Sequence, residues 1–205
     1  MKPQVSREHY GQTPYKKLER WVNYWHQMDL VRKESPASVL EVGVGAGIVS
    51  KQLKSEFNVT TLDIDPALGP DIVGSITRIP IPDKSVDVVL AAEILEHLPW
   101  PQEVSSALKE MARVSKKSLV ISVPHAGFCF MMSFKFPLIP KVQLLLKLPY
   151  FYKTHVFDGE HYWEIGKKGY PIRVLVELAQ ESGLRLKFRK TYADDPMRIF
   201  FVFGV

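Results

Sequence analysis

Three glycines at alternate positions, Gly43, Gly45 and Gly47, follow an apolar run that ends in Val42. A helical pattern begins at Ile48, so the segment predicts a strand, a tight turn and the N-terminus of a helix. Such a turn brings backbone N–H groups close to a ligand, and glycine permits both the unusual dihedral angles and the close approach. The alternative is an ordinary strand-to-helix loop.

Glu41, two residues before the first glycine, restricts the charge of this ligand. A nucleotide pyrophosphate would be repelled by the carboxylate, at a cost that grows as water is excluded. A ligand that carries an ammonium and a sulfonium would be attracted instead. The dinucleotide-binding pattern also needs a glycine at position 48, where this chain has Ile48. The turn therefore favours a positively charged molecule over a dinucleotide.

A second acid, Asp63, ends the next apolar run, 20 residues after Gly43. A carboxylate at this place can accept hydrogen bonds from both hydroxyls of a ribose. Asp65, directly before Pro66, is instead typical of a helix-capping residue. We therefore expect Asp63 to bind a ribose.

Strand and helix patterns alternate along the chain, which predicts an α/β fold with a Rossmann-like, doubly wound and mostly parallel sheet. Ligands of such sheets bind beyond the carboxyl ends of the strands, the edge to which Glu41, Asp63, Ser75 and Glu93 map. Strands are expected over 38–42, 59–62, 71–73, 86–91, 118–123, 184–190 and 197–203, and helices over 47–56, 101–114 and 171–182. In the last strand the run 199–203 is uninterruptedly apolar, which predicts insertion into the sheet rather than an exposed edge.

The segment before the first strand predicts a polar arm over 1–13 and a helix from Pro14 to Pro36. Apolar residues recur in it at helical spacing: Leu18, Trp21, Val22, Trp25 and Met28. We expect this aromatic stripe to pack on the domain, with closure over the ligand as a second interpretation.

The 205 residues fit a single domain, and the 46% hydrophobic and 24% charged content is typical of globular proteins. The lone Cys129 excludes an internal disulfide framework and a multi-cysteine zinc site, and fits a reducing compartment. The net charge of +5 comes from scattered residues, so it does not by itself identify nucleic acid or membrane as a partner. The polar N-terminus gives no sign of a secretory signal, so a cytoplasmic or membrane-peripheral location is expected.

From about 38 to 123 the chain resembles a class I S-adenosylmethionine-dependent methyltransferase of the small methyltransferase domain 11/25 type. The resemblance is carried by VLEVGVGAG, TLDIDP and IPIPDKSVDVVLAAEILEHL. It implies a seven-stranded sheet with the last strand antiparallel, and S-adenosyl-L-methionine as cofactor. The residues that it implies around the cofactor are Glu41, Gly43, Gly45, Gly47, Asp63, Ile64, Ser75, Ile76, Ala92 and Glu93.

Ser75 departs from this family, because many members have an aspartate there that accepts from the adenine amino group. A neutral hydroxyl accepts a weaker hydrogen bond, so either the Ile76 backbone holds adenine or the affinity is modest. His97 is common in relatives, and we expect it to bond nearby backbone rather than to act in catalysis.

The domain divides into an N-terminal arm and helix (1–37), a cofactor-binding half (38–124), a substrate-side insertion (125–169) and a final helix and strand pair (170–205). The insertion is apolar and carries lysines at intervals of six, and its prolines and lysines exclude a spanning helix. We expect a helical insertion that forms a lid, a contact of 128–151 with an anionic membrane, or a core or dimer cover. Candidate substrate-side residues are His125, His155, His161 and Tyr162, and no metal motif is recognised.

The sequence thus predicts methyl transfer to an oxygen or nitrogen of a small, lipid-like or cell-envelope acceptor. An RNA-directed methyltransferase and a non-catalytic S-adenosylmethionine-binding protein are the alternatives, and a nicotinamide dehydrogenase is the weakest reading. Because a sulfonium already activates its methyl group, the protein mainly aligns the acceptor, and no catalytic base can be assigned from the sequence.

Overall fold

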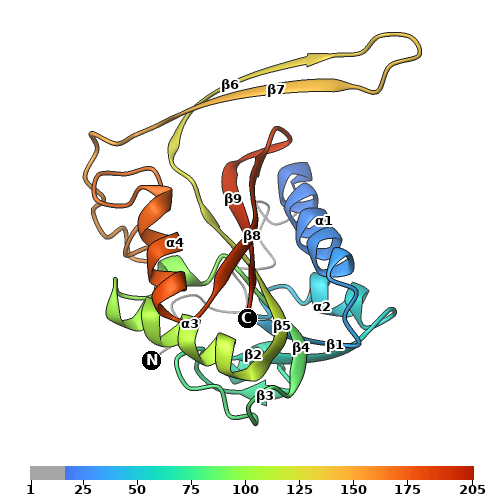
Figure 1. The fold of residues 1–205 in the computed structure, drawn as a ribbon, viewed down its shortest axis with the longest axis vertical. Coiled ribbons are helices and arrows are strands. Elements are labelled where there is room, and N and C mark those ends of the chain that lie inside the picture. The colour runs from blue at the N-terminus through green and yellow to red at the C-terminus, as the bar shows by residue number, and fades with distance from the viewer. Residues whose placement is uncertain (1–16) are drawn as a thin grey trace.

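The strands predicted from the sequence form one seven-stranded sheet in the computed structural model, which describes residues 17–205 (Figure 1). The predicted polar arm and the first residues of the predicted N-terminal helix lie outside the described residues. The sheet order is β3-β2-β1-β4-β5-β9-β8. Its strands are β1 (Ser38–Val42), β2 (Asn58–Asp63), β3 (Ile72–Val73), β4 (Val86–Ala92), β5 (Ser115–Pro124), β8 (Arg185–Tyr192) and β9 (Asp195–Gly204).

The strand directions agree with the predicted doubly wound sheet. β1 pairs in parallel with β2 and β4, and β5 continues the parallel part. β9 runs antiparallel to both of its neighbours, β5 and β8. Insertion of β9 is confirmed, and its Phe200, Phe201 and Phe203 are fully buried because helices cover both faces of the sheet.

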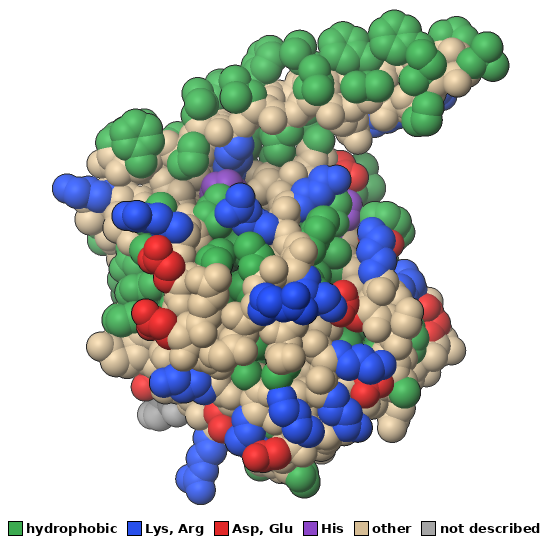
Figure 2. All heavy atoms as spheres, viewed as in Figure 1, with side chains coloured by type: hydrophobic (Ala, Val, Ile, Leu, Met, Phe, Trp, Pro, Cys, Tyr) green, Lys and Arg blue, Asp and Glu red, His purple; other side chains and the backbone are tan. Residues whose placement is uncertain are grey.

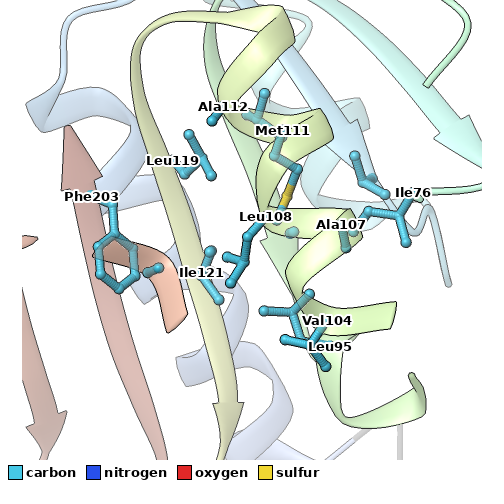
Figure 3. Packing of buried hydrophobic residues seen from close by; sticks show 14 of the residues in the cluster. Ile76, Leu95, Val104, Ala107, Leu108, Met111, Ala112, Leu119, Ile121 and Phe203 are labelled. Atoms are coloured by element: carbon cyan, nitrogen blue, oxygen red, sulfur yellow. The ribbon is translucent and has the colours of Figure 1, made fainter. Parts of the chain in front are cut away.

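Helices α1 (Leu18–Lys33) and α2 (Ile48–Leu53) lie on one face of the sheet, and α3 (Gln102–Val114) and α4 (Ile172–Glu181) on the other (Figure 1). Two short 3₁₀ helices, η3 (Pro66–Leu68) and η4 (Leu95–His97), follow the ends of β2 and β4. The predicted apolar face of α3 packs on β4 and β5, and its Leu108 and Met111 belong to the same buried cluster as Leu119, Ile121 and Phe203 (Figure 3). This packing fixes the helices that flank the carboxyl edge of the sheet.

The prediction for the N-terminal helix is wrong about which face is buried. Trp21 and Trp25 are 51% and 53% exposed, whereas the polar Asn23, His26 and Gln27 are buried. The reason lies in the turn between β8 and β9, whose acids accept from the polar side of α1. Asn23 Nδ2 donates to Asp195 Oδ2 over 3.1 Å, and His26 Nε2 lies 2.8 Å from Asp194 Oδ1. These acids are far away in sequence, so the helical spacing alone could not reveal them.

The prediction of a helical insertion after β5 is also wrong. Residues 127–149 form a separate antiparallel hairpin of β6 (Gly127–Phe134) and β7 (Val142–Pro149), which reaches out from the body (Figure 1). The apolar residues Phe128, Phe130, Met132 and Phe134 recur with a period of two, which is the period of a strand. Among the described residues, no helix has both the length and the apolar character needed to cross a bilayer.

Candidate functional site

A cavity of about 800 Å³ opens at the carboxyl ends of β1, β2 and β4, where the sequence places the ligand. Its walls include most of the residues predicted around the cofactor: Glu41, Gly43, Gly45, Asp63, Ile64, Ile76, Ala92 and Glu93. The N-terminal helix adds Arg20, Tyr24 and Gln27, which agrees with the interpretation that this segment also closes over the ligand.

The glycine turn has the backbone conformation that its sequence predicts. Gly43, Gly45 and Gly47 have φ values of +81°, +52° and +67°, a region that favours glycine. A Cβ on Gly43 would lie 2.1 Å from Ile94 Cδ1. The turn is held against the end of β2, because Gly43 N donates to Leu62 O over 2.8 Å. Gly47 is the N-cap residue of α2 and is not part of the cavity wall.

Glu41 is buried at the floor of the cavity with an unsatisfied carboxylate oxygen. The side chain is 5% exposed, and Oε2 has no hydrogen-bond partner among the described residues. Burial raises the pKa of this carboxyl to about 8, so the carboxyl is mostly neutral at pH 7 until a cation approaches. A cationic ligand group would supply the missing partner and favour the ionised form.

Asp63 lines the cavity and also fixes the glycine turn. Its Oδ2 accepts from Val44 N over 2.8 Å, and its Oδ1 accepts from Asp65 N over 2.9 Å. Each carboxylate oxygen keeps a further lone pair that a ribose hydroxyl can use. Asp65 caps η3, because its Oδ1 accepts from Ala67 N over 2.9 Å, which confirms the capping role expected for it.

Ser75 does not take the position that the resemblance implies. It is not part of the cavity wall, and its hydroxyl lies 2.9 Å from Thr77 Oγ1 and accepts from Thr77 N over 3.3 Å. The side chain is therefore used within its own turn. Its neighbour Ile76, 5% exposed, does line the cavity. Two alternatives followed from Ser75: either the Ile76 backbone holds adenine, or the affinity for the cofactor is modest. The position of Ile76 in the cavity wall favours the first.

Residues 40–121, which carry the glycine turn, Asp63 and Glu93, match the methyltransferase domain family. They form the cofactor-binding core of a class I S-adenosylmethionine-dependent methyltransferase. The resemblance seen in the sequence is thereby confirmed, as is S-adenosylmethionine as the cofactor of this methyltransferase. A comparison with curated proteins finds no match to the chain.

Solved structures share the fold of the methyltransferase across nearly its whole length. The protein PH0226 of Pyrococcus horikoshii OT3 is 15% identical, with a TM-score of 0.64 over 98% of this chain and 99% of that one. An S-adenosylmethionine-dependent methyltransferase of Clostridium acetobutylicum is 9% identical, with a TM-score of 0.63 over 94% and 96%. The 1,6-didemethyltoxoflavin-N1-methyltransferase of Burkholderia thailandensis, bound to its substrate and S-adenosylhomocysteine, is 12% identical, with a TM-score of 0.62 over 97% and 86%.

The residues of the methyltransferase fit its cofactor. The unsatisfied Glu41 Oε2 can accept from the ammonium group, and Gly43 and Gly45 bring side-chain-free backbone to the cavity wall. Asp63 and Ile64 line the same cavity, as the expected contacts with ribose and adenine require. When bound, the cofactor supplies a methyl group that its sulfonium has already activated.

Titration of Glu41 predicts how the stability of the methyltransferase changes with pH. Because its pKa of about 8 lies above the ordinary 4.5, the folded state binds more protons than the unfolded state between these values. The free energy of unfolding should therefore fall as the pH rises from 4.5 to 8. We expect Glu41→Gln to remove roughly 3–5 kcal/mol of this fall. Urea unfolding of wild type and variant at pH 5 and pH 8 measures it.

The control for this measurement is Glu177→Gln, which makes the same chemical change on the exposed side of α4. It should leave the wild-type slope unchanged. Equal slopes for wild type and Glu41→Gln would show that Glu41 titrates normally in the folded protein.

A buried network that the sequence did not reveal supports the end of β4. Glu93, whose φ is +57°, accepts from Ser122 Oγ at Oε1 over 3.0 Å and from Arg198 Nε at Oε2 over 2.9 Å. Arg198 Nη1 also donates to Asp195 Oδ1 over 2.8 Å, and Arg198 lines the cavity. The sequence did contain one signal of this network. Arg198 directly precedes the apolar run of the last strand, and a charge that folding buries there requires partners.

On the substrate side, His161 and Glu164 form a pair in the cavity wall. His161 Nδ1 lies 3.6 Å from Glu164 Oε1, and Lys167 Nζ lies 2.6 Å from Glu164 Oε2. The contact with Glu164 raises the pKa of His161, and the contact with His161 lowers the pKa of Glu164 to about 2. The cavity therefore contains an imidazole that lies beside a fixed carboxylate, close enough for an ion pair but beyond hydrogen-bond distance.

Two further groups adjoin His161. Burial raises the pKa of Glu96 well above its ordinary value, and both of its carboxyl oxygens lack partners among the described residues. His97 Nδ1 lies 3.0 Å from Glu160 O, which confirms the expected bond to nearby backbone. Donor atoms of Glu96, His97 and His161 lie within 4.8 Å of one another, so a divalent cation could be placed there. A bound cation would have to displace the protons of Glu96 and His161, whose pKa values are raised. The expectation that the protein binds no metal stays a prediction.

The other substrate-side candidates have different positions. His125 lines the cavity, and burial lowers its pKa to about 4, so it is neutral. His155 and Tyr162 are not part of the cavity wall. His155 Nε2 lies 2.9 Å from the carbonyl oxygen of His161, so it supports the backbone of His161 rather than facing the substrate. Tyr162 packs against Phe157, with ring centroids 4.6 Å apart, and is 38% exposed.

Proposed function

We propose that this methyltransferase transfers the methyl group to an oxygen or nitrogen of a lipid-like acceptor. The observation that carries the proposal is the part of the cavity wall that residues after β5 form. It contains the pair of His161 and Glu164 together with Ala126 and Tyr150, which lead directly into the exposed apolar hairpin. An acceptor with a polar head and an apolar body would match both parts.

The volume of the cavity is that of a large ligand pocket. Pockets for a single small molecule range over about 300–1,000 Å³, and this cavity, at about 800 Å³, is near the upper end of that range. The Burkholderia relative holds a methyl acceptor and the demethylated cofactor together in the same fold. The acceptor proposed here would contact the wall formed by His125, Tyr150 and His161.

His161 has the chemistry needed to remove the proton of the acceptor. Its Nδ1 faces Glu164, which leaves Nε2 to take the proton of a hydroxyl or amine as the new bond to carbon forms. Glu164, whose Oε1 lies 3.6 Å from Nδ1, stabilises the imidazolium that results.

The test of the proposal uses cofactor with a radiolabelled methyl group and the full chain. It is incubated separately with a membrane-lipid extract, a panel of water-soluble phenols and amines, and total RNA. We expect label in the fraction that partitions into organic solvent, and the labelled product is identified by mass spectrometry. Label in RNA alone, or in none of the fractions, would overturn the proposal.

His161→Ala is expected to lower kcat by about 100-fold, because general-base catalysis contributes about 10²–10⁴-fold. The dissociation constant of the cofactor should change little. Glu164→Gln removes the group that raises the pKa of His161, so the acidic limb of the pH–rate profile, where the base becomes protonated, should shift to lower pH.

Tyr162→Phe is the control for these variants, because Tyr162 is adjacent to His161 but outside the cavity wall. It should retain wild-type kcat. An unshifted pH–rate profile in Glu164→Gln, or an unchanged kcat in His161→Ala, would exclude His161 as the base.

A further inference from the structure

The hairpin of β6 and β7 has two faces of opposite character. On one face, which we call the outer face, the cross-strand pairs are Phe128–Leu148, Phe130–Leu146, Met132–Leu144 and Phe134–Val142. All eight of these side chains are between 40% and 58% exposed. The pairs on the opposite, inner face are Cys129–Lys147, Met131–Leu145 and Ser133–Gln143. A continuous apolar strip of this kind on a protein surface marks an interaction site.

Contacts of the inner face with the body fix which way the hairpin faces. Lys147 Nζ donates to the carbonyl oxygens of His125 and Pro196, and Cys129 Sγ lies 3.7 Å from Pro196 O. The outer face therefore cannot turn over to pack on the body. Figure 2 shows hydrophobic side chains along the edge of the hairpin that points away from the body, with lysine on its underside.

The charge of the hairpin has a single sign. Lys135 and Lys141 flank a tip that contains Phe136, Leu138 and Ile139, all of them exposed. Residues 127–153 include the four lysines and no aspartate or glutamate. Protein interfaces are depleted in lysine, whereas lysines beside an apolar face are attracted to anionic lipid headgroups.

We propose that the outer face of this hairpin docks on the surface of an anionic lipid bilayer. The hairpin would lie in the interface, with its apolar side chains among the upper acyl chains and the tip lysines, Lys135 and Lys141, at the phosphates. A two-stranded ribbon has two edges with unpaired backbone groups, so it stays at headgroup depth, where water satisfies them.

A second copy of the chain is a poorer occupant of the outer face. With eight residues in each strand, the strip is a narrow ribbon, roughly 27 Å long and about 10 Å wide. In a second copy the tip would also carry Lys135 and Lys141, so like charges would be added to the interface. A bilayer can surround the tip and both edges, and its anionic headgroups attract these lysines.

The docked position would serve the active site. Ala126 and Tyr150, which directly flank the two strands, line the cavity, as does Lys153. A lipid acceptor could thus pass from the bilayer along the base of the hairpin into the cavity; this last step rests on the proposed function, whereas the docking does not.

The experiment is co-sedimentation of the full chain with vesicles of phosphatidylcholine alone and of phosphatidylcholine with 30% phosphatidylglycerol, without cofactor or acceptor. We expect binding to the anionic vesicles that is at least tenfold stronger than to the neutral ones and that weakens with salt. Phe130→Ser/Leu146→Ser should reduce this binding at least tenfold, and Lys135→Glu/Lys141→Glu should remove the preference for anionic vesicles.

Ser133→Ala/Gln143→Ala, a cross-strand pair on the inner face, is the matched control and should bind like wild type. Calorimetry of cofactor binding checks that the apolar-pair variant is folded. The proposal is overturned if wild type does not bind vesicles, if folded Phe130→Ser/Leu146→Ser binds equally well, or if that variant instead abolishes a dimer formed without lipid. Vesicle binding without methylation of any lipid would leave the docking intact and refute only the proposed acceptor.

Discussion

Gly43→Ala is expected to weaken cofactor binding by about 30-fold or more. The new Cβ would lie 2.1 Å from Ile94 Cδ1 and 2.8 Å from Ile94 Cγ1, and an alanine would have to keep a φ of +81°. The backbone strain alone is about 1–3 kcal/mol, and each 1.4 kcal/mol is a factor of ten. The turn relaxes by moving away from Ile94, which displaces the backbone that faces the cofactor. Isothermal calorimetry with S-adenosylmethionine and S-adenosylhomocysteine measures the loss.

Gly69→Ala separates the collision from the strain. Gly69 also has a positive φ, +66°, but its added Cβ would meet nothing within 4 Å. This variant should lose about 1 kcal/mol of stability and keep its affinity for the cofactor within about twofold. Ile94→Ala in the Gly43→Ala background should restore part of the binding. Equal losses of affinity in Gly43→Ala and Gly69→Ala would show that the collision with Ile94 does not weaken cofactor binding.

Arg198→Met is expected to lower the free energy of unfolding by about 3–5 kcal/mol, because it leaves the buried Asp195 and the mostly buried Glu93 without their cation. Glu93 and Asp195 both accept from Arg198, and the Asp195 side chain is only 2% exposed. In a domain of this size such a loss lowers Tm by roughly 6–20 °C. Urea and thermal unfolding measure it, and Glu93→Gln added to Arg198→Met should recover part of the stability.

Arg32→Met is the matched control, since Arg32 also donates to a carboxylate, that of Glu56, but at the surface. Its loss should stay below about 1 kcal/mol, as for other exposed ion pairs. Losses of similar size in the two variants would show that the pairing of Glu93 with Arg198 contributes no more to the free energy of unfolding than an exposed ion pair does.

The helical insertion was expected from composition, and the structure shows a β-hairpin instead. The periodicity of the apolar residues would have predicted the strands. Its apolar content and its lysines at intervals of six suggested an amphipathic helical cover. Between 128 and 134, however, Phe128, Phe130, Met132 and Phe134 all lie on the outer face, and Cys129, Met131 and Ser133 on the inner one. The period of two was present in the sequence, and it decides the secondary structure because successive strand side chains point to opposite faces.

The cofactor side was determined by the sequence itself. Glu41, the glycine turn and Asp63 lie at the ends of consecutive parallel strands, and such ends meet at one edge of the sheet whatever the rest of the chain does. Tertiary structure alone decided which distant groups complete the site. The bond between Glu93 and Arg198 joins residues 105 positions apart, and that between Asn23 and Asp195 joins residues 172 apart. The local spacing of residues cannot reveal such pairs. They form only when β9 inserts beside β5 and α1 packs on the turn that precedes β9.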